Sequence, residues 1–276
     1  MYITLPSNSS TELYPQNTVS DFKVHLPKEI NLIDQWEVGL SEVFYTNSWY
    51  NVETNLYWVY FRRGEVSVLV WITAGFYRHP EFIVREMLHQ MRTQFKKKNR
   101  EMLEQNEITE PVDFLFNLRY NTYSQLCEII IDHKEGGPMI ETEDGTEEPN
   151  VTLTLSRPLA EMLGFEKTQF LQTGVFRSDH TVNLDTVNAL YLYCDVMEHR
   201  TVGHTLAPLL GVIPVEGRPG SHVSKRYEKL QYHPVIKKNI SDIHITIRDD
   251  QGRQIRFRKG KLIVTLHFRR RKLTWL

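Results

Sequence analysis

The residues with the clearest potential for metal chemistry are one cysteine and two histidines. Cys194, His199 and His204 lie within eleven residues of one another, and thiolate and imidazole are ligands that zinc prefers in proteins. Four residues separate each successive pair, and no fourth ligand stands nearby. Cys194 also shares its strand parity with apolar neighbours. We therefore predict a structural cysteine and two surface histidines rather than a metal site.

A second place where metal chemistry is conceivable is the acidic, glycine-rich segment 135–149. Its carboxylates offer oxygen ligands for a divalent cation, but their spacing matches no calcium loop. The segment has no large apolar residue beyond Met139 and Ile140, so packing would not offset the entropy of ordering it. We expect an exposed, mobile loop. The role of the acidic residues between 141 and 148 stays open.

Motifs of known catalytic sites are absent from the sequence. It contains no glycine-rich phosphate loop, no Gly-x-Ser-x-Gly elbow and no His-Glu-x-x-His pair. Residues distant in sequence can still assemble an acid–base site, so an enzyme and a lectin-like sandwich remain minority hypotheses. We predict that the protein is not an enzyme and uses no cofactor.

Positive charge is concentrated at the C-terminal end of the chain. Nine Lys or Arg residues and no Asp or Glu lie between 253 and 276, whereas the whole chain balances 33 Lys+Arg against 34 Asp+Glu. A nearly neutral molecule is not attracted to nucleic acid over long distances, so any attraction must be local. The candidate contacts for nucleic acid or a protein partner are Arg256, Arg258, Lys259, Arg269, Arg270, Arg271 and Lys272.

The alternative to a binding role is that these basic residues are only a solvated surface. If residues 256–258 form a strand, alternation places Arg256 and Arg258 on one face. Trp275 is a candidate apolar anchor for the tail. A second basic run, at 96–100, is more typical of a solvated helix face than of a nucleic-acid contact.

The elements that must position these residues are mostly strands. Apolar and polar residues alternate over 21–26 and again over 36–45, where a slip indicates a bulge near Gly39 or Ser41. We predict that Trp36, Val38 and Leu40 face a core. Further strands are expected at 56–61, 66–72, 114–120, 125–131, 151–155, 186–196, 243–248 and 262–268.

One segment has helical periodicity instead. Val84, Met87, Leu88, Met91 and Phe95 recur at intervals of three and four, which predicts a helix over about 80–105 that covers a sheet face or edge. The chain lacks the βαβ rhythm of a parallel sheet. The predicted fold is therefore mainly β, a jelly-roll β-sandwich forming a single domain over 1–276, with a helix-containing insertion at about 74–180.

Two further observations concern the compartment. The chain has two cysteines, which gives no disulfide framework and is typical of a reducing environment. The first residues lack the features of a signal peptide, and no run is long and apolar enough to span a membrane. We expect a protein of the cytosol or nucleus without a membrane span.

Several stretches resemble a known family. They are LPSNSS (5–10), NTVSDF (17–22), WEVGLSE (36–42), LYLYCD (190–195), LAPLL (206–210), IRDDQG (247–252) and LIVTLHFRR (262–270). Together they look like the minor capsid (penton) protein of Maverick/Polinton elements and of adintoviruses. The resemblance spans nearly the whole chain, and the two ends are its specific part.

The resemblance implies a structural viral protein without a catalytic motif. Such a protein forms homopentamers at the vertices of an icosahedral virus-like capsid, beside a double-jelly-roll major capsid protein, and is assembled in the host cytoplasm or nucleus. Packaged DNA is a further candidate partner. The alternatives are a nucleic-acid- or partner-binding module, and a capsid-derived protein retained by a host.

Overall fold

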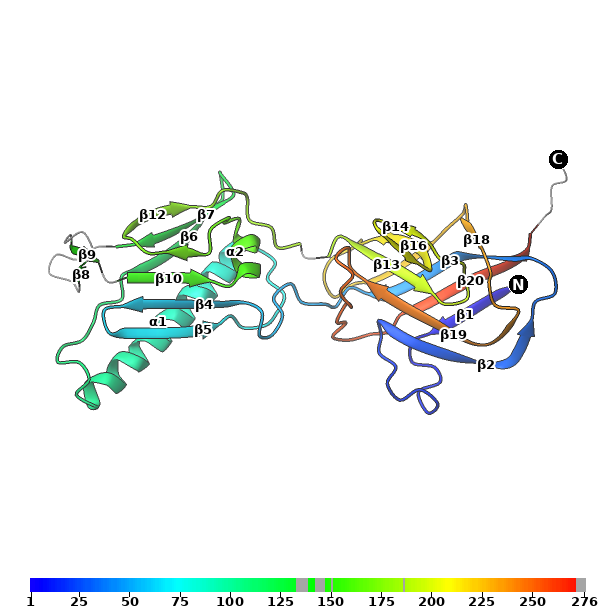
Figure 1. Ribbon diagram of the computed structural model, residues 1–276, viewed down its shortest axis with the longest axis horizontal. Helices are drawn as coiled ribbons and strands as arrows, with labels where there is room; N and C mark the ends of the chain where they lie inside the picture. The colour runs from blue at the N-terminus through cyan, green and yellow to red at the C-terminus, as the bar shows by residue number, and fades with distance from the viewer. Residues whose placement is uncertain (133–138, 142–146, 150, 186, 272–276) are drawn as a thin grey trace. The chain divides into compact units, whose positions relative to one another are not determined.

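The computed structural model describes residues 1–132, 139–141, 147–149, 151–185 and 187–271, which form two compact units (Figure 1). The first unit combines Met1–Trp49 with Val187–Leu276, and the second is the intervening Tyr50–Thr186. Each unit has its own buried apolar cluster. Most elements are antiparallel strands, which confirms the predicted fold class.

The first unit is built from two antiparallel sheets. One has the strand order β1 (Tyr2–Pro6), β20 (Ile263–Arg270), β3 (Trp36–Thr46) and β17 (His222–Arg226), and β18 (Tyr232–Pro234) also pairs with β3. The other has the order β16 (Leu209–Pro214), β13 (Ala189–Cys194), β19 (Asn239–Arg248) and β2 (Asp21–Asn31). A small hairpin of β14 (Arg200–Val202) and β15 (Thr205–Ala207) lies between β13 and β16 in the sequence.

This strand order is that of a jelly roll. Along the chain, each main strand is followed by one in the opposite sheet, except that β13 and β16 are neighbours. The eight main strands thus form two four-stranded sheets with the crossing connections of paired Greek keys. The predicted jelly-roll sandwich is confirmed, and the second unit occupies the connection between β3 and β13.

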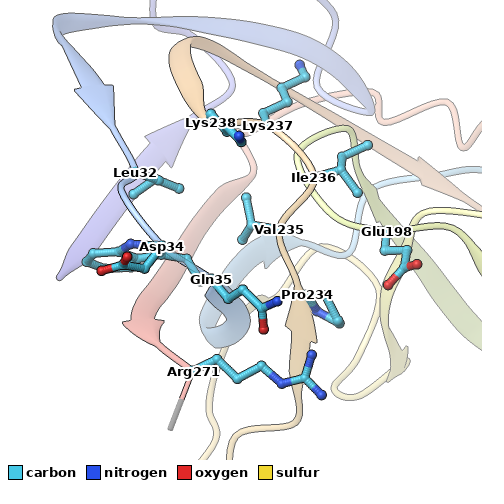
Figure 2. A pocket seen from close by; sticks show the side chains of 11 residues that line it. Leu32, Asp34, Gln35, Glu198, Pro234, Val235, Ile236, Lys237, Lys238 and Arg271 are labelled. Atoms are coloured by element: carbon cyan, nitrogen blue, oxygen red, sulfur yellow. The ribbon is translucent and has the colours of Figure 1, made fainter. Parts of the chain in front are cut away.

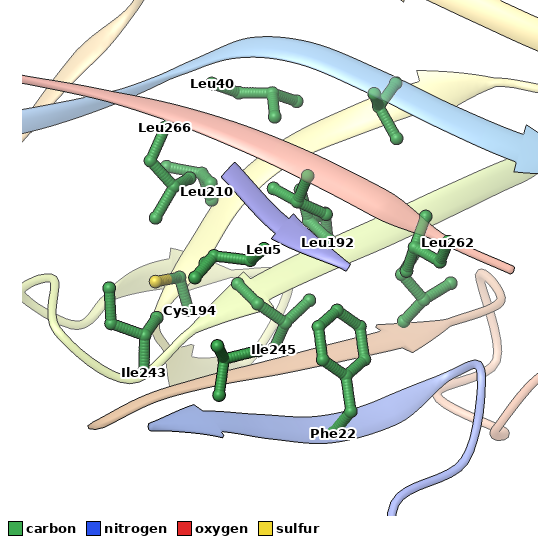
Figure 3. Close-up of a cluster of buried hydrophobic side chains, with 14 of the residues drawn as sticks. Leu5, Phe22, Leu40, Leu192, Cys194, Leu210, Ile243, Ile245, Leu262 and Leu266 are labelled. Atoms are coloured by element: carbon green, nitrogen blue, oxygen red, sulfur yellow. The ribbon is translucent and has the colours of Figure 1, made fainter. Parts of the chain in front are cut away.

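Alternation along the strands supplies the core of the sandwich. Leu5, Phe22, Leu192, Ile245 and Leu266 converge between the two sheets (Figure 3), and each is at most 1% exposed. These side chains come from five strands and from both halves of the sequence. Closing the core therefore requires the two ends of the chain to meet.

Strand β3 follows the sequence prediction in one respect and departs from it in another. Its pairing with β20 shifts register at Ser41, because Thr265 faces Glu42 while Leu266 faces Leu40, and this confirms the predicted bulge. Val38 and Leu40 are buried as predicted, but Trp36 is only half-buried. Trp36 begins the strand, so its ring packs at the margin of the core, and its indole nitrogen donates to the Ile33 carbonyl.

The second unit, here called the inserted unit, contains two larger sheets. The first has the order β11 (Gln169–Phe170), β10 (Val151–Leu155), β4 (Trp58–Arg63) and β5 (Val66–Trp71). The second has the order β12 (Gly174–Arg177), β7 (Leu126–Ile131) and β6 (Phe116–Asn121). Two short strands, β8 (Met139–Glu141) and β9 (Glu147–Pro149), pair with each other, and the helices are α1 (Pro80–Glu104) and α2 (Arg157–Leu163).

Helix α1 belongs to the core of the inserted unit. Its residues Val84, Met87, Met91 and Phe95 are buried, and the helix packs on β5 and β6. The Phe95 ring stacks on Phe61 of β4 with 5.9 Å between centroids. The predicted apolar stripe therefore covers a sheet face as expected, apart from Leu88, which is half-buried at the edge of the contact.

Helix α2 ends where only glycine fits. Gly164 has φ +85°, which is a left-handed backbone conformation. The Gly164 N–H donates a backbone hydrogen bond to the Ala160 carbonyl and so completes the last turn of the helix. A Cβ at this position would lie 2.0 Å from the His180 carbonyl oxygen. Gly164 thus allows the segment after β12 to pass directly over the helix end.

The predicted insertion at about 74–180 falls within the inserted unit, which begins earlier, at Tyr50. The hairpin β4–β5 accounts for the difference, because it pairs with β10 and packs under α1. The description of 1–276 as one jelly-roll-based domain stays a prediction. Most of the acidic segment 135–149, including residues 142–146, lies outside the described residues.

The packing predicts how two core substitutions should differ. Phe268 is fully buried in the jelly-roll core, so Phe268→Ala should lower the free energy of unfolding of this unit by about 3–5 kcal/mol. Trp36→Ala should cost clearly less, because half-burial leaves less area to lose. Denaturant titration would measure both. Equal losses for the two variants would contradict this description of β3 and β20.

Candidate functional site

The structure divides the predicted basic site into two groups. Arg256, Arg258 and Lys259 lie in the loop that precedes β20, whereas Arg269 and Arg270 end that strand and Arg271 follows it. The eight residues of β20 hold the groups roughly 25 Å apart at about 3.3 Å per residue. Lys272 and Trp275 lie outside the described residues. The basic residues thus form two local surfaces and not one.

The loop group is held by backbone and aromatic contacts. Residues 256–258 do not form a strand, so the condition that the sequence analysis considered is not met, although exposure still alternates along them. Phe257 is half-buried and meets Trp49 edge-on at 5.5 Å, while Arg256 and Arg258 on either side are exposed. Ser48 fixes the loop further, because its hydroxyl donates to the Lys259 carbonyl over 2.7 Å.

The strand group is partly neutralised by Glu37. Both Nε and Nη2 of Arg269 lie 3.0 Å from Glu37 Oε2, and Nε of Arg271 is 3.8 Å from Oε1. The Arg269 guanidinium also lies 3.5 Å from the centre of the Tyr232 ring. Because the Glu37 side chain is only 15% exposed, this pairing is screened less by salt than a fully exposed one. Sequence reasoning missed Glu37, which is 232 residues away from Arg269.

Arg270 is the freest cation of this group. Its guanidinium lies 5.8 Å from the Trp36 ring, and no described carboxylate lies within ion-pair distance of it. Arg271 instead lines a shallow groove of about 340 Å³ (Figure 2). Lys238 and Asp34 line the same groove, so its charge is mixed. Arg270 is therefore the arginine of this end that has no described carboxylate partner.

The N-terminus lies against the same end of β20. The Met1 amine donates to the Phe268 carbonyl, and the Met1 carbonyl accepts from the Phe268 N–H, each over 2.8 Å. The Tyr2 ring lies 4.4 Å from the His267 ring. We call this end of the sandwich, with Met1, Glu37, Arg269, Arg270 and Arg271, the terminal end.

His267 occupies an electropositive position at the terminal end. Burial lowers its pKa, and the N-terminal amine and Arg269 lower it further by repulsion. Its Nδ1 lies 2.7 Å from the Tyr232 hydroxyl. Gly39 makes this contact possible, because a Cβ there would lie 2.9 Å from the Gln231 carbonyl oxygen and 3.3 Å from the Tyr232 ring.

A second polar cluster, which the sequence analysis did not identify, ties the segment 7–20 to the edge of β2. The Asp242 carboxylate accepts from the Tyr14 hydroxyl at 2.5 Å and lies 2.8 Å from His25 Nδ1, and the Tyr14 bond is the main cause of its lowered pKa. The Asn17 side-chain amide bonds both backbone groups of Lys23. These contacts satisfy the open edge of β2, so we assign the cluster a structural role.

The candidate metal ligands are not brought together. Cys194 is fully buried in the jelly-roll core, and burial raises the pKa of its thiol to about 12. His199 and His204 are exposed. In the part of the chain that the structure describes, no three His, Cys, Asp or Glu side chains are grouped so that they could hold a metal ion. The predicted structural cysteine and surface histidines are confirmed.

The two units differ in charge although the chain is nearly neutral. Residues 1–49 and 187–276 carry 19 Lys+Arg and 13 Asp+Glu, a formal charge of +6, whereas residues 50–186 carry 14 and 21, a charge of −7. In the basic run at 96–100 of the acidic unit, Lys96, Lys97 and Arg100 are exposed on α1, whereas Lys98 is half-buried and Asn99 is buried. Local attraction of an anionic partner is therefore expected at the jelly-roll unit.

No helix within the described residues has the length and apolar character that crossing a bilayer requires. No protein-family model matches the chain, and no curated protein matches its sequence. Solved structures do match. One is the crystal structure of the mavirus penton protein, with 9% identity, a TM-score of 0.45, and coverage of 97% of this chain and 98% of that chain.

A cryo-EM structure of the Sputnik virophage also matches, with 10% identity, a TM-score of 0.41, and coverage of 97% of both chains. The chain is thus similar to the mavirus penton protein over nearly its whole length. Likeness at this level carries no functional conclusion, which must rest on the chain's own topology and residues.

The position of His267 predicts a pH dependence. The folded state favours neutral His267, so the unfolded chain binds the proton more tightly, and the free energy of unfolding should fall as the pH drops below about 6.5. Burial also lowers the pKa of His233, so His233 should contribute to the pH dependence in the same direction. Denaturant titrations at pH 7.5 and 5.5 would measure the effect.

The matched control is His267→Gln, which keeps a polar group near the Tyr232 hydroxyl but cannot titrate. Its stability should depend less steeply on pH than that of the native chain. An unchanged dependence would show that His267 does not couple to folding.

Proposed function

We propose that this chain is a structural minor capsid (penton) protein that forms homopentamers at the vertices of an icosahedral capsid. The observation that carries the proposal is the complete jelly-roll strand order, formed by the same two ends of the chain that resemble Maverick/Polinton and adintovirus pentons. In this proposal it assembles beside a double-jelly-roll major capsid protein, is located in the virion capsid and catalyses no reaction.

The jelly-roll unit has two distinct ends, which supports such a role. Both described chain ends meet at the terminal end, where Met1 bonds Phe268. The chain passes into the inserted unit after Trp49, beyond the opposite end of β3. Identical subunits in a closed ring are related by rotation, so every subunit has the same orientation relative to the ring axis. If strand β3 runs along the ring axis, such a ring would collect five terminal ends on one side and the five exits after Trp49 on the other.

Mass measurement tests the pentamer. Light scattering and native mass spectrometry of the purified chain should give five times the protomer mass of 32.6 kDa, and negative-stain images should show five-fold symmetry. Like the mass, the symmetry is a direct consequence of ring closure. A monomer at all concentrations, both alone and with the major capsid protein, would contradict the proposal.

A second candidate function is nucleic-acid binding, and the +6 charge of the jelly-roll unit favours it. In a ring, five copies of Arg270 would share one rim, so weak single contacts would add up. The partner would be packaged DNA in a capsid, or another nucleic acid if the chain is a binding module. Binding of this kind weakens with salt, because it depends on counterion release.

Arg270→Ala tests this candidate with little risk to folding, since the side chain is exposed. DNA affinity should fall, and the slope of log K against log salt should become shallower by about 1 for each Arg270–phosphate contact that is lost. Lys97→Ala, on the exposed side of α1, is the matched control and should change neither quantity. If only the Lys97 variant lost DNA affinity, the result would show that the inserted unit, and not the terminal end, contacts the DNA.

A further inference from the structure

The groove that Arg271 lines is preformed between two walls. One wall is the segment 32–36, which leads into β3, and the other is the segment 234–238, which begins with the last residue of β18 (Figure 2). Backbone hydrogen bonds join the walls. One runs from the Leu32 N–H to the Lys238 carbonyl over 2.7 Å, and another runs over 2.9 Å from the N–H next to Pro234 to the carbonyl of the first residue of β3. A groove held in this way binds a peptide without first being ordered.

The groove exposes apolar side chains that the sandwich core does not use. Ile236 lines the groove and is 53% exposed, whereas its neighbour Val235 packs against the core. Ile33, which stands between the lining residues Leu32 and Asp34, is 73% exposed. At about 340 Å³ the groove is near the lower limit of ligand pockets, so it has room for a few side chains and not for a folded domain. A short apolar peptide therefore fits this surface.

The charges of the groove favour a peptide that carries a positive charge. Two lining cations already have partners, because Lys237 Nζ lies 2.6 Å from Asp195 Oδ2 and Arg271 Nε lies 3.8 Å from Glu37 Oε1. Three lining charges make no ion pair with any described residue, and these are Asp34, Glu198 and Lys238. A nucleic acid or a phosphate group placed here would meet two unpaired carboxylates, whereas a cation would gain from them.

The chain itself supplies such a peptide at this place. Arg271 lies at the edge of the groove, because its N–H donates to the carbonyl of the lining residue Gln35 over 2.8 Å. The tail segment, residues 272–276, follows directly and lies outside the described residues. Its sequence, KLTWL, combines one positive charge with three large apolar side chains. Five extended residues span roughly 16 Å at about 3.3 Å per residue, which is long enough to enter a groove that begins at Arg271.

We propose that the tail segment binds in the groove of its own chain. In this proposal Trp275 covers the exposed surface of Ile236, and Lys272 meets the carboxylate of Asp34. A segment tethered at the edge of its site has an effective concentration in about the millimolar range, which favours it over the same segment of a neighbouring copy. Binding neutralises Lys272, so this residue would not contribute to DNA binding at the terminal end. The proposal rests on the groove and does not depend on the pentamer.

Cysteine cross-linking of the full chain tests the location of the tail segment. Ile236→Cys combined with Thr274→Cys places one thiol in the groove and one in the tail segment, and it leaves the three apolar side chains of the tail segment in place. A short bifunctional thiol reagent should link these two thiols within one chain. The native Cys127 and Cys194 are buried and should not react.

The matched control is Val212→Cys combined with Thr274→Cys. Val212 is 43% exposed on β16, and strand pairing through Tyr191 places it beside Arg248 at the end of β19. The groove adjoins the beginning of β19, and the ten residues of that strand span roughly 30 Å at about 3.3 Å per residue. The control should therefore cross-link at least tenfold more slowly than the Ile236 variant.

A double-mutant cycle on the full chain tests the energetics. Ile236→Ala and Trp275→Ala should each destabilise the jelly-roll unit in denaturant titrations. If the two side chains touch, the combined variant should be more stable than the product of the two separate effects predicts, by at least threefold in the unfolding equilibrium constant. Val212→Ala combined with Trp275→Ala should show no such coupling, because these residues lie far apart.

Three results would contradict the proposal. They are a cross-link between two chains in place of one within a chain, equal cross-linking rates in the Ile236 variant and its control, and additive effects in the Ile236–Trp275 cycle. The first result would assign the groove to the tail segment of a neighbouring copy. None of the three changes the expected five-fold mass, so failure of this proposal and failure of the pentamer are distinguishable.

Discussion

The jelly-roll core can close only when strands from the two ends of the sequence lie in the same sheets. Strand β20 lies between β1 and β3, and β19 lies between β13 and β2. Each supplies inward residues that are fully buried, such as Leu266 and Ile245. Half of such a sandwich would expose its apolar face to water, so the remaining elements depend on this closure. The inserted unit does not depend on this closure, because it has a core of its own.

Sequence patterns predict the local elements well because each pattern is set by local contacts. Alternation indicated most strands of the sandwich, the slip in β3 indicated its bulge, and the period of α1 indicated its buried side. Pairing between distant residues leaves no such signal. The Glu37–Arg269 contact, and the burial of Phe257 against Trp49, depend on which strands become neighbours. For the same reason the pattern of β4 and β5 could not show which core they join.

Net charge conceals most of the electrostatic character of this chain. A formal charge of −1 results from +6 on the jelly-roll unit and −7 on the inserted unit. Within the jelly-roll unit the basic residues are divided again, because Glu37 neutralises part of one group while the loop before β20 carries the other. Positive residues that are close in sequence therefore do not form one continuous surface.

The central position of β20 also determines the order in which the chain can fold during synthesis. All of the inserted unit has been translated before β13 emerges, so this unit can fold on the ribosome as a contiguous segment. The jelly roll must wait for its final strand, and until then β1 and β3 have no partner between them. Nascent chains thus carry a finished acidic unit attached to an incomplete sandwich, and that sandwich is the part most in need of a chaperone.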